Sequence, residues 1–332
     1  MSDRGLFDLI ISLLPDIPPA DKISLLRGFE NEQDFYVQSK KDLEKFLNRE
    51  IKSFWDINDI REKAERTESV CRTRSIKWVS WLDGEYPPLL REMYDPPPVI
   101  FYLGHLPNPE KSLLGMVGTR KPSPQSASHA YDIACGVGCS GISVVSGLAL
   151  GIDAMSHRGN LSAGVPGYAV LGSGADEIYP STNRMLAKGI LDSGGAIISE
   201  YHPGTPPAKW NFPARNRIIS ALSRSVLVVE APEKSGALIT AGFALEQGRD
   251  LWVASSGIQP GLPHEQNGGL FDRTGTLKLA ADGAEIIYSA DDVLEKWNIK
   301  TPRNRDAAAV PQWDVSGKEL ASSMASFLGI GI

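Results

Sequence analysis

The sequence has little cysteine and no long apolar run. Its three cysteines, Cys71, Cys135 and Cys139, form no even set and no Cys-x-x-Cys spacing, so neither a disulfide framework nor a cysteine metal site is indicated. We expect all three to be small buried hydrophobic side chains. No apolar stretch approaches the roughly 20 residues that a helix needs to cross a bilayer.

The sequence also lacks the features of a signal peptide. Asp3 precedes the first apolar stretch and Asp8 lies inside it, whereas signal peptides have a basic start, an uncharged centre and a cleavage site of small residues. We therefore predict a cytoplasmic protein with no membrane partner.

An excess of positive charge is absent as well. The formal net charge is −6 and the pI is about 5.5, which argues against a nucleic-acid-binding surface spread over the whole chain. It does not exclude a basic groove, because the field near a cleft depends on charges within about one Debye length. The local distribution of charge is therefore the more informative quantity.

Several motifs of enzymes and cofactor-binding proteins are missing. No G-x-G-x-x-G follows the first predicted strand, and the P-loop, H-E-x-x-H and G-x-S-x-G patterns do not occur. Gly172-Ser173-Gly174 lacks a third glycine and carries little weight alone. We predict no cofactor, no metal, no catalytic residue and no enzymatic activity.

Three segments follow one another along the chain. Residues 1–75 combine helical apolar spacing with proline breaks, which predicts a small all-α domain. Residues 76–110 contain many prolines and are expected to be an extended, packed connector at the start of a 76–298 domain. Residues 299–332 have few order signals, and we expect a poorly ordered tail.

Short apolar runs alternate with amphipathic segments from about residue 113 to residue 297. This alternation predicts an α/β fold: a Rossmann-like parallel sheet with helices on both faces. Ligands of such sheets bind outside the carboxyl ends of the strands, so the loops after the strands are the candidate site. The predicted strands are residues 113–117, 142–145, 167–171, 196–199, 226–229, 251–254 and 285–287.

The loop after the first strand combines a turn, cations and a helix cap. Its residues include Gly118, Thr119, Arg120, Lys121 and Ser123, and Pro124 follows. A Ser-Pro pair is a good N-cap and first turn, and a helix N-terminus attracts anions. No acidic residue occurs between positions 111 and 131. We predict phosphate binding here; the alternative is a structural turn in which the arginine pairs with a carboxylate.

The next two loops add further candidates. In the second, Asp153 and His157 are spaced for one helix face; we favour a helix-start carboxylate over a general-base pair because no nucleophile accompanies them. In the third, a tyrosine could stack on a base and an arginine could reach a phosphate, or the tyrosine could simply pack before a capped helix. The candidates in these two loops are Ser146, Gly147, Tyr179, Asn183 and Arg184.

The fourth loop is the most informative. No acidic residue occurs from position 201 to position 229, where Lys209, Arg215, Arg217 and Arg224 supply four positive charges. Aromatic rings among cations suit a nucleic-acid single strand, because cations bind its backbone and rings stack on its bases. Two arginines two positions apart on a helix do not share a face, so one of them is expected to pack. In the fifth loop a cap and a glycine begin a helix, which predicts either another anion site or an ordinary capped helix with no ligand. The candidates in the fourth and fifth loops are Phe212, Arg215, Asn216, Arg217, Ser235 and Gly236.

At these loops the sequence resembles the DprA/Smf family of DNA-processing proteins. The matching stretches include MVGTRKPS, VVSGLALGIDAMSHRG, FPARNRIISALS and VVEAPEKSGALITAGFALEQGR, in order within residues 113–294. The resemblance implies a homodimer that binds single-stranded DNA without sequence preference and helps to load RecA recombinase, alongside single-strand-binding protein, during natural transformation. It also implies that Arg120 contacts phosphate, that residues 212–217 form the family's F-P-x-R-N-R segment, and that the helical N-terminus is a SAM-like accessory domain.

Two other functions remain as alternatives. The stretch from Ser235 to Thr240, followed by Glu246, faintly resembles a motif of Rossmann-type nucleoside-monophosphate phosphoribohydrolases, with Glu200 or Glu230 as the carboxylate. The tandem glycine that precedes that motif is missing. A small nucleotide-sensing module is the third possibility.

Overall fold

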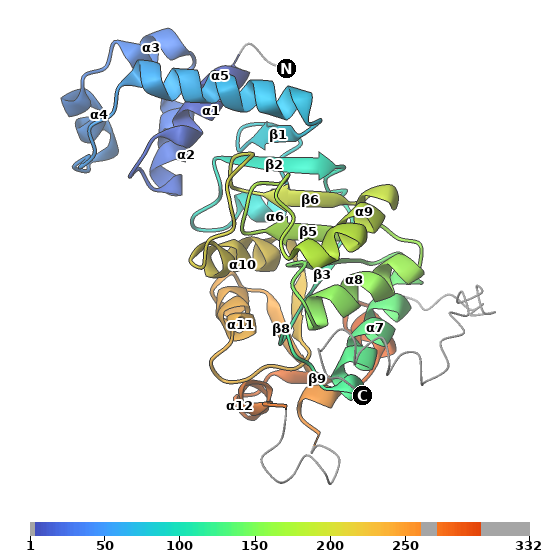
Figure 1. The fold of residues 1–332 in the computed structure, drawn as a ribbon. Helices are drawn as coiled ribbons and strands as arrows, with labels where there is room; N and C mark the ends of the chain where they lie inside the picture. Colours follow the sequence, from blue (N-terminus) through green and yellow to red (C-terminus); the bar gives the residue numbers. More distant parts are fainter. Residues whose placement is uncertain (1–3, 260–270, 300–332) are drawn as a thin grey trace.

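A nine-stranded sheet forms the centre of the protein, with the order β1-β2-β6-β5-β4-β3-β7-β8-β9 (Figure 1). The computed structural model describes residues 4–259 and 271–299. The strands are β1 (Lys77–Ser80), β2 (Val99–Gly104), β3 (Leu113–Val117), β4 (Ser143–Ser146), β5 (Tyr168–Leu171), β6 (Ala196–Ser199), β7 (Ser225–Val228), β8 (Asp250–Ala254) and β9 (Glu285–Ile287).

All strands from β3 to β9 run parallel, and β2 and β1 add an antiparallel edge beyond β6. Every residue of β3, LLGMV, is buried, as expected for a central parallel strand that is covered on both faces. Strand order reverses at β3, whose neighbours are β4 on one side and β7 on the other. The fold-class prediction is confirmed.

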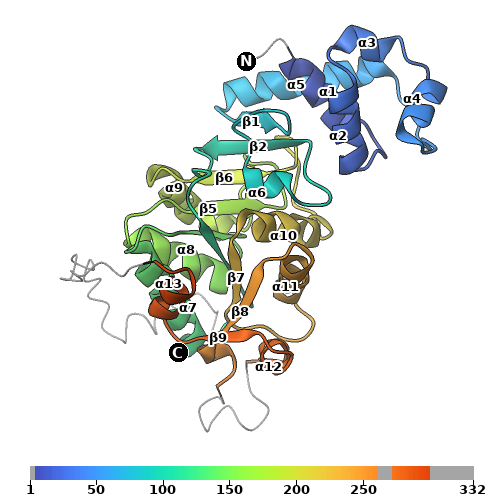
Figure 2. The ribbon, with the colours of Figure 1, turned by 180° about the vertical axis from the view of Figure 1, so that it is seen from behind.

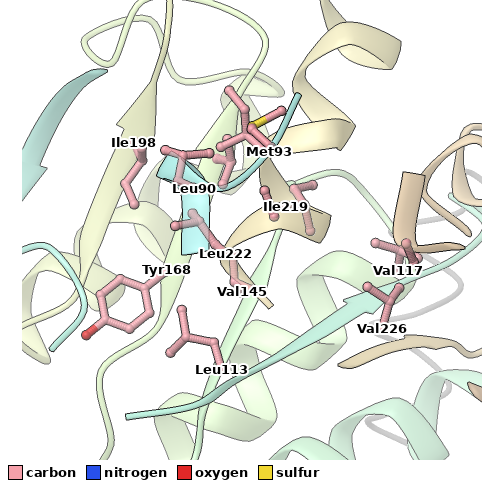
Figure 3. Packing of buried hydrophobic residues seen from close by; sticks show 14 of the residues in the cluster. Leu90, Met93, Leu113, Val117, Val145, Tyr168, Ile198, Ile219, Leu222 and Val226 are labelled. Atoms are coloured by element: carbon pink, nitrogen blue, oxygen red, sulfur yellow. The ribbon is translucent and has the colours of Figure 1, made fainter. Parts of the chain in front are cut away.

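Helices cover both faces of the sheet (Figures 1 and 2). On one face Ile219 and Leu222 of α10 and Leu90 of α6 pack against strand side chains such as Val145 and Ile198 (Figure 3). On the other face α8 packs against β3 and β4, α7 packs against β4, and α9 packs against β5 and β6, while α13 packs against α7 and β9. Burial of each such side chain contributes about 1.5–3 kcal/mol. The helices are α6 (Pro88–Arg91), α7 (Pro124–Gly138), α8 (Ile152–Ser162), α9 (Arg184–Asp192), α10 (Asn211–Leu222), α11 (Gly236–Glu246), α12 (Thr274–Ala281) and α13 (Ala290–Lys296).

Five helices precede the sheet and have an apolar core of their own. Phe7, Leu25, Phe35 and Ile60 belong to this core, which continues into Phe101 of β2. The helical segment is therefore joined to the antiparallel edge of the sheet by packed side chains. Its helices are α1 (Gly5–Leu13), α2 (Pro19–Gly28), α3 (Glu32–Tyr36), α4 (Lys40–Leu47) and α5 (Ile57–Thr73).

The structure differs from the sequence predictions in the proline-rich segment and at two of the cysteines. Residues 76–110 are not a mere connector, because they contain β1, β2 and the short helix α6. Cys71 is buried as expected, but Cys135 is only half-buried and Cys139 is exposed, since both lie toward the C-terminal end of α7. The predicted tail, residues 299–332, lies almost wholly outside the described residues.

Within the described residues, no helix is both long and apolar enough to cross a membrane.

Candidate nucleic-acid interface

The loops after β3, β4, β5, β6 and β7 lie together along the side of the sheet where the strands have their carboxyl ends, because these five neighbouring strands are parallel. This carboxyl-end edge of the sheet is distinct from the lateral edge formed by β1 and β2. The loop after β3 is fixed to the loops on both sides by its main chain. Thr119 N donates to the carbonyl of Glu230 at 2.7 Å, and Ile152 N donates to the carbonyl of Thr119 at 3.2 Å. This tethering holds the β3–α7 loop, residues 118–123, in one position.

Two glycines allow the close approach of these loops. A Cβ atom on Gly118 would lie 2.5 Å from Cγ1 of Ile152, and one on Gly151 would lie 2.4 Å from the carbonyl oxygen of Thr119. Gly151 also has φ +76°, a conformation that disfavours residues with a side chain. Glycine at these two positions therefore allows the β3–α7 loop to pack directly against Ile152 and the loop before α8.

Arg120, Phe212 and Tyr179 form a cation–ring–ring group at this edge. The Arg120 guanidinium lies 5.6 Å from the centre of the Phe212 ring. The Phe212 and Tyr179 rings are 5.5 Å apart at 40°. Arg120 and the adjacent Lys121 are exposed, and Tyr179 is 45% exposed. Two strand-end loops and the first turn of α10, where Phe212 is half-buried, thus bring a cation and aromatic rings together.

Arg215 points into the protein. It is 5% exposed; its Nη1 donates to the carbonyl of Gly147 at 2.8 Å and to that of Val170, and its Nε donates to Oδ1 of Asn216 at 3.1 Å. Burial lowers the pKa of Arg215 to about 10, against the opposing effect of Asp153. These contacts support a structural role, and direct contact with a ligand stays a prediction.

Arg217 is buried on a different side of α10. Its Nε lies 3.3 Å from Oδ2 of Asp95, and its Nη2 pairs with Glu200. Burial raises the pKa of the Glu200 carboxyl, and the Arg217 charge opposes that rise. Both of the arginines in the F-P-x-R-N-R segment therefore have partners inside the protein, where the sequence led us to expect only one to pack.

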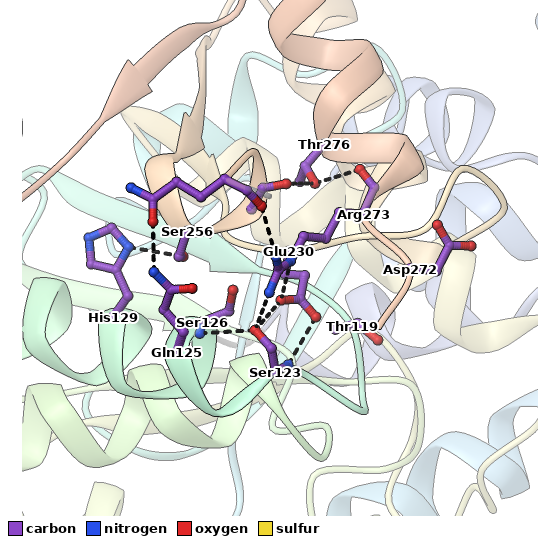
Figure 4. Close-up of polar contacts among 12 residues, drawn as sticks. Thr119, Ser123, Gln125, Ser126, His129, Glu230, Ser256, Asp272, Arg273 and Thr276 are labelled. Atoms are coloured by element: carbon purple, nitrogen blue, oxygen red, sulfur yellow. Dashed lines mark hydrogen bonds and ion pairs between the residues drawn. The ribbon is translucent and has the colours of Figure 1, made fainter. Parts of the chain in front are cut away.

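The start of α7 is occupied by a carboxylate of the protein itself (Figure 4). Glu230, fully buried after β7, accepts from Ser123 N at 3.0 Å and from Ser123 Oγ at 2.6 Å. Arg273 Nε donates to Glu230 Oε2 at 3.2 Å, and Arg273 Nη2 donates to Ser123 Oγ at 2.9 Å. Both polar groups of Ser123 that donate are therefore bound to this carboxylate, and contact of Ser123 with a DNA phosphate stays a prediction.

Asp153 is a carboxylate at the start of a helix and not half of a general-base pair with His157. Asp153 Oδ2 accepts from the backbone N–H groups of Gly147 at 3.1 Å and Ala149 at 3.3 Å. His157 is fully buried, and both ring nitrogens lack a partner among the described residues. Burial lowers the pKa of His157 to about 3, so it is neutral. No group of three or more potential metal ligands occurs in the described part of the chain.

Most of the other predicted contact residues support the loops from within. Asn183 donates to the carbonyl of Leu148 at 2.9 Å, Ser146 to that of Met116 at 2.6 Å and Asn216 to that of Gly236 at 3.0 Å. Arg184 and Gly236 are exposed, and Ser235 is half-buried. The site residues therefore divide into an exposed group and a buried supporting group.

Sequence reasoning missed three contributors. Glu230 and Arg273 gave no signal as a pair, since they lie far apart in the chain and meet only in the fold. Trp210, 78% exposed beside the exposed Lys209 just before α10, was visible as an aromatic residue in the acid-free loop but was not counted among the contacts.

Comparison with known proteins identifies the family. A family model described as DNA recombination-mediator protein A matches residues 77–298. The chain belongs to this family. The match covers the whole sheet and the loops just described, so the resemblance drawn from the sequence motifs is confirmed.

Curated relatives carry the names DprA and Smf. The chain is 37% identical over 253 residues to the DNA processing protein DprA of Bacillus subtilis, which is 75% of this chain and 79% of that protein. It is 45% identical over 216 residues to the protein Smf of Synechocystis, 64% of this chain. That alignment spans only about half, 52%, of the Synechocystis protein.

Solved structures of DprA proteins have the same fold. The X-ray structure of DprA from Streptococcus pneumoniae matches with a TM-score of 0.67 and 29% identity over 91% of this chain and 99% of that chain. A DprA from Helicobacter pylori, described for its single-stranded DNA binding mode, matches with a TM-score of 0.56 and 27% identity, covering 67% of this chain and 95% of its own.

Proposed function

We propose that this member of the recombination-mediator family binds single-stranded DNA without sequence preference at the edge formed by Arg120, Phe212 and Tyr179. The observation that carries the proposal is the cation–ring–ring group, in which Arg120 and Tyr179 are exposed and the half-buried Phe212 lies between them. Arg120 and Lys121 neutralise backbone phosphates, and the ring of Tyr179 stacks on a base. The Helicobacter pylori relative, which is described as binding single-stranded DNA, supports the same class of ligand.

A single strand fits this edge better than a duplex does. Stacking on a side chain requires an unpaired base, and every base has a ring face, so stacking confers affinity without reading sequence. Trp210, exposed at the start of α10, offers a second ring along the same loop. The segment from residue 201 to residue 229, which includes α10 and β7, has no acidic residue, so it does not repel the backbone despite the net charge of −6.

The test is a titration of a labelled oligo-dT with the full chain at several salt concentrations, followed by fluorescence anisotropy. Each phosphate contact on a single strand contributes about −0.7 to the slope of log K against log salt. Arg120→Ala should weaken binding and make the slope shallower by about that amount. Arg224→Ala is the matched control, because Arg224 is exposed in the same acid-free segment but precedes β7, at the opposite edge of the sheet.

Tyr179 provides the second arm of this test. Loss of one stacked ring costs about 1–3 kcal/mol of binding free energy. Tyr179→Ala should therefore weaken oligo-dT binding, while Tyr179→Phe keeps the ring and retains most of the affinity. Binding that is absent at low salt, or equal in wild type, Arg120→Ala and Tyr179→Ala, contradicts the proposal.

We further propose, from the family resemblance, that the chain is a cytoplasmic homodimer that acts as a binding protein rather than an enzyme in DNA processing during transformation. In this role it helps to load RecA onto single-stranded DNA coated with single-strand-binding protein. Light scattering tests the dimer. A RecA ATPase assay on coated single-stranded DNA tests loading, and loss of stimulation by Arg120→Ala would tie loading to the proposed DNA site.

The phosphoribohydrolase and nucleotide-sensing alternatives gain no support from the two carboxylates considered for catalysis. Glu200 pairs with Arg217 and Glu230 with Arg273, both inside the protein. Incubation with nucleoside monophosphates, with chromatography for released base, tests the hydrolase directly.

A further inference from the structure

The position where this fold type binds nucleotide phosphates is filled by the chain's own Glu230. In doubly wound sheets, ligands bind where the strand order reverses, and their phosphate lies at the N-terminus of the helix that follows the first strand. Here the order reverses at β3, between β4 and β7, and α7 begins directly after the β3 loop. Ser123 is the N-cap of α7, and Glu230 follows β7.

The groups around the Glu230 carboxylate are hydrogen-bond donors. Ser123 supplies its backbone N–H and its hydroxyl, at 3.0 Å and 2.6 Å. Arg273 supplies a guanidinium N–H at 3.2 Å and a positive charge. Donors that converge with a cation at a helix N-terminus form an anion site, so a carboxylate is the group that this arrangement accommodates.

The residues around this carboxylate are buried, and polar contacts already join them to one another (Figure 4). Ser123 and Glu230 are 1% and 0% exposed, and Arg273 is 8% exposed. Arg273 is also held by the carbonyl of Gln259, to which its Nη1 donates at 2.8 Å. Ser126, on the first turn of α7, is fully buried, and its hydroxyl has no partner in the described part of the chain. Removal of the Glu230 carboxylate would leave the N–H and the hydroxyl of Ser123 without the acceptor that they now bind.

We infer that Glu230 is an internal substitute for a nucleotide phosphate, which closes the switch point of the sheet to phosphate-bearing small molecules. Removing its carboxylate should open a site that binds inorganic phosphate. The inference is independent of the proposed DNA binding, because Arg120 and Lys121 lie on the exposed side of the same loop.

The experiment measures thermal unfolding of the full chain in potassium phosphate and in potassium chloride at equal pH and ionic strength. Phosphate stabilises many proteins by exclusion from their surface, so the informative quantity is the shift relative to wild type. Glu230→Ala should unfold at a lower temperature than wild type in chloride and recover part of that loss in phosphate, rising with concentration as a binding equilibrium requires. The matched control is Glu233→Ala in the same loop, which removes an exposed carboxylate.

Two further variants keep the result decisive. Glu230→Ala combined with Arg273→Ala should lose the extra response to phosphate, because the cation of the site is gone. Glu230→Gln leaves no room for phosphate and should respond only as wild type does. If Glu230→Ala is unfolded in chloride, the readout becomes recovery of near-ultraviolet circular dichroism on addition of phosphate. An equal phosphate shift in wild type, Glu233→Ala and Glu230→Ala, or no recovery from the unfolded state, overturns the inference.

Discussion

Arg120 and Arg215 have the same side chain at the same edge of the sheet but opposite surroundings. Arg120 is exposed and lies over a ring, whereas Arg215 is 5% exposed and donates to two main-chain carbonyls, of Gly147 after β4 and of Val170 in β5. The first can exchange its water for a phosphate at little cost. The second would have to leave carbonyls and the Asp153 charge unpaired, which is unfavourable in a buried site.

This contrast predicts a clear separation of stability from binding. Arg215→Ala removes the buried cation near Asp153 and the donor to the carbonyls of Gly147 and Val170. It should lower the free energy of unfolding by about 3 kcal/mol or more. Arg120→Ala, on the surface, should change it by less than about 0.5 kcal/mol. Urea unfolding of both variants measures the difference. Arg215→Lys, which keeps the charge but not the planar fork, should fall between them; wild-type stability of Arg215→Ala would refute the structural role.

At the level of helices and strands, the amino-acid sequence was enough to predict the parallel strands of the sheet. A central strand covered on both faces is a short run of apolar residues, as in LLGMV of β3, and such runs stand out between amphipathic helices. The antiparallel edge was missed, because β1 has the mixed burial pattern of an edge strand and β2 directly follows Pro96-Pro97-Pro98. Proline next to a short strand removes the local signal while long-range pairing still forms the strand.

The candidate site could be located from sequence but not resolved in detail. Loops after parallel strands must lie together, so Arg120, Tyr179 and Phe212 could be placed at one edge. Charge and residue type do not reveal which way a side chain points, so the burial of Arg217 against Glu200 needed the structure. The pairing of Glu230 with Ser123 joins residues 107 positions apart and likewise has no local signal.

The loop between β3 and α7 packs against the loop between β4 and α8, so a substitution in the second loop should affect DNA binding by the first. Gly151→Ala introduces a Cβ atom 2.4 Å from the Thr119 carbonyl oxygen at a residue with φ +76°, so the loop that carries Arg120 must shift. We expect a loss of about 1–3 kcal/mol of stability and weaker oligo-dT binding. Gly164→Ala is the control, since Gly164 has φ +73° with nothing within 4 Å. It should lose stability but keep its DNA affinity; equal affinity for the two variants argues against a tethered loop.

At the scale of the whole molecule, the buried groups that join the helical segment to the sheet lie close to the strand-end loops. Lys22 of α2 is held by the carbonyl of Ser12 at 2.6 Å, and burial lowers the pKa of Lys22 to about 8, with Glu200 opposing that shift. Glu200 also binds Arg217 of α10. Lys22 of the helical segment is therefore close enough to Glu200 to affect the electrostatics of the carboxylate that pairs with Arg217 of α10.

Buried neutral histidines predict how the stability of the molecule depends on pH. Burial lowers the pKa of His157 from 6.5 to about 3. Between these two values the unfolded chain binds a proton that the folded chain does not, so stability is complete above pH 6.5 and falls as the pH falls toward 3. Each pH unit below 6.5 costs about 1.4 kcal/mol, which gives roughly 2 kcal/mol at pH 5 from His157 alone.

The measurement is urea unfolding of wild type and His157→Leu at pH 7.5 and pH 5. Leucine cannot take up a proton in either state, so the variant should lose roughly 2 kcal/mol less than wild type between these conditions, whatever the repacking costs at pH 7.5. His202, whose pKa burial lowers to about 4, should still contribute its own acid-dependent loss in that variant. His105→Leu, at an exposed position after β2, should lose as much as wild type. An equal loss in wild type and His157→Leu would mean that His157 accepts a proton in the folded state, with water or a carboxylate reaching a ring that is fully enclosed here.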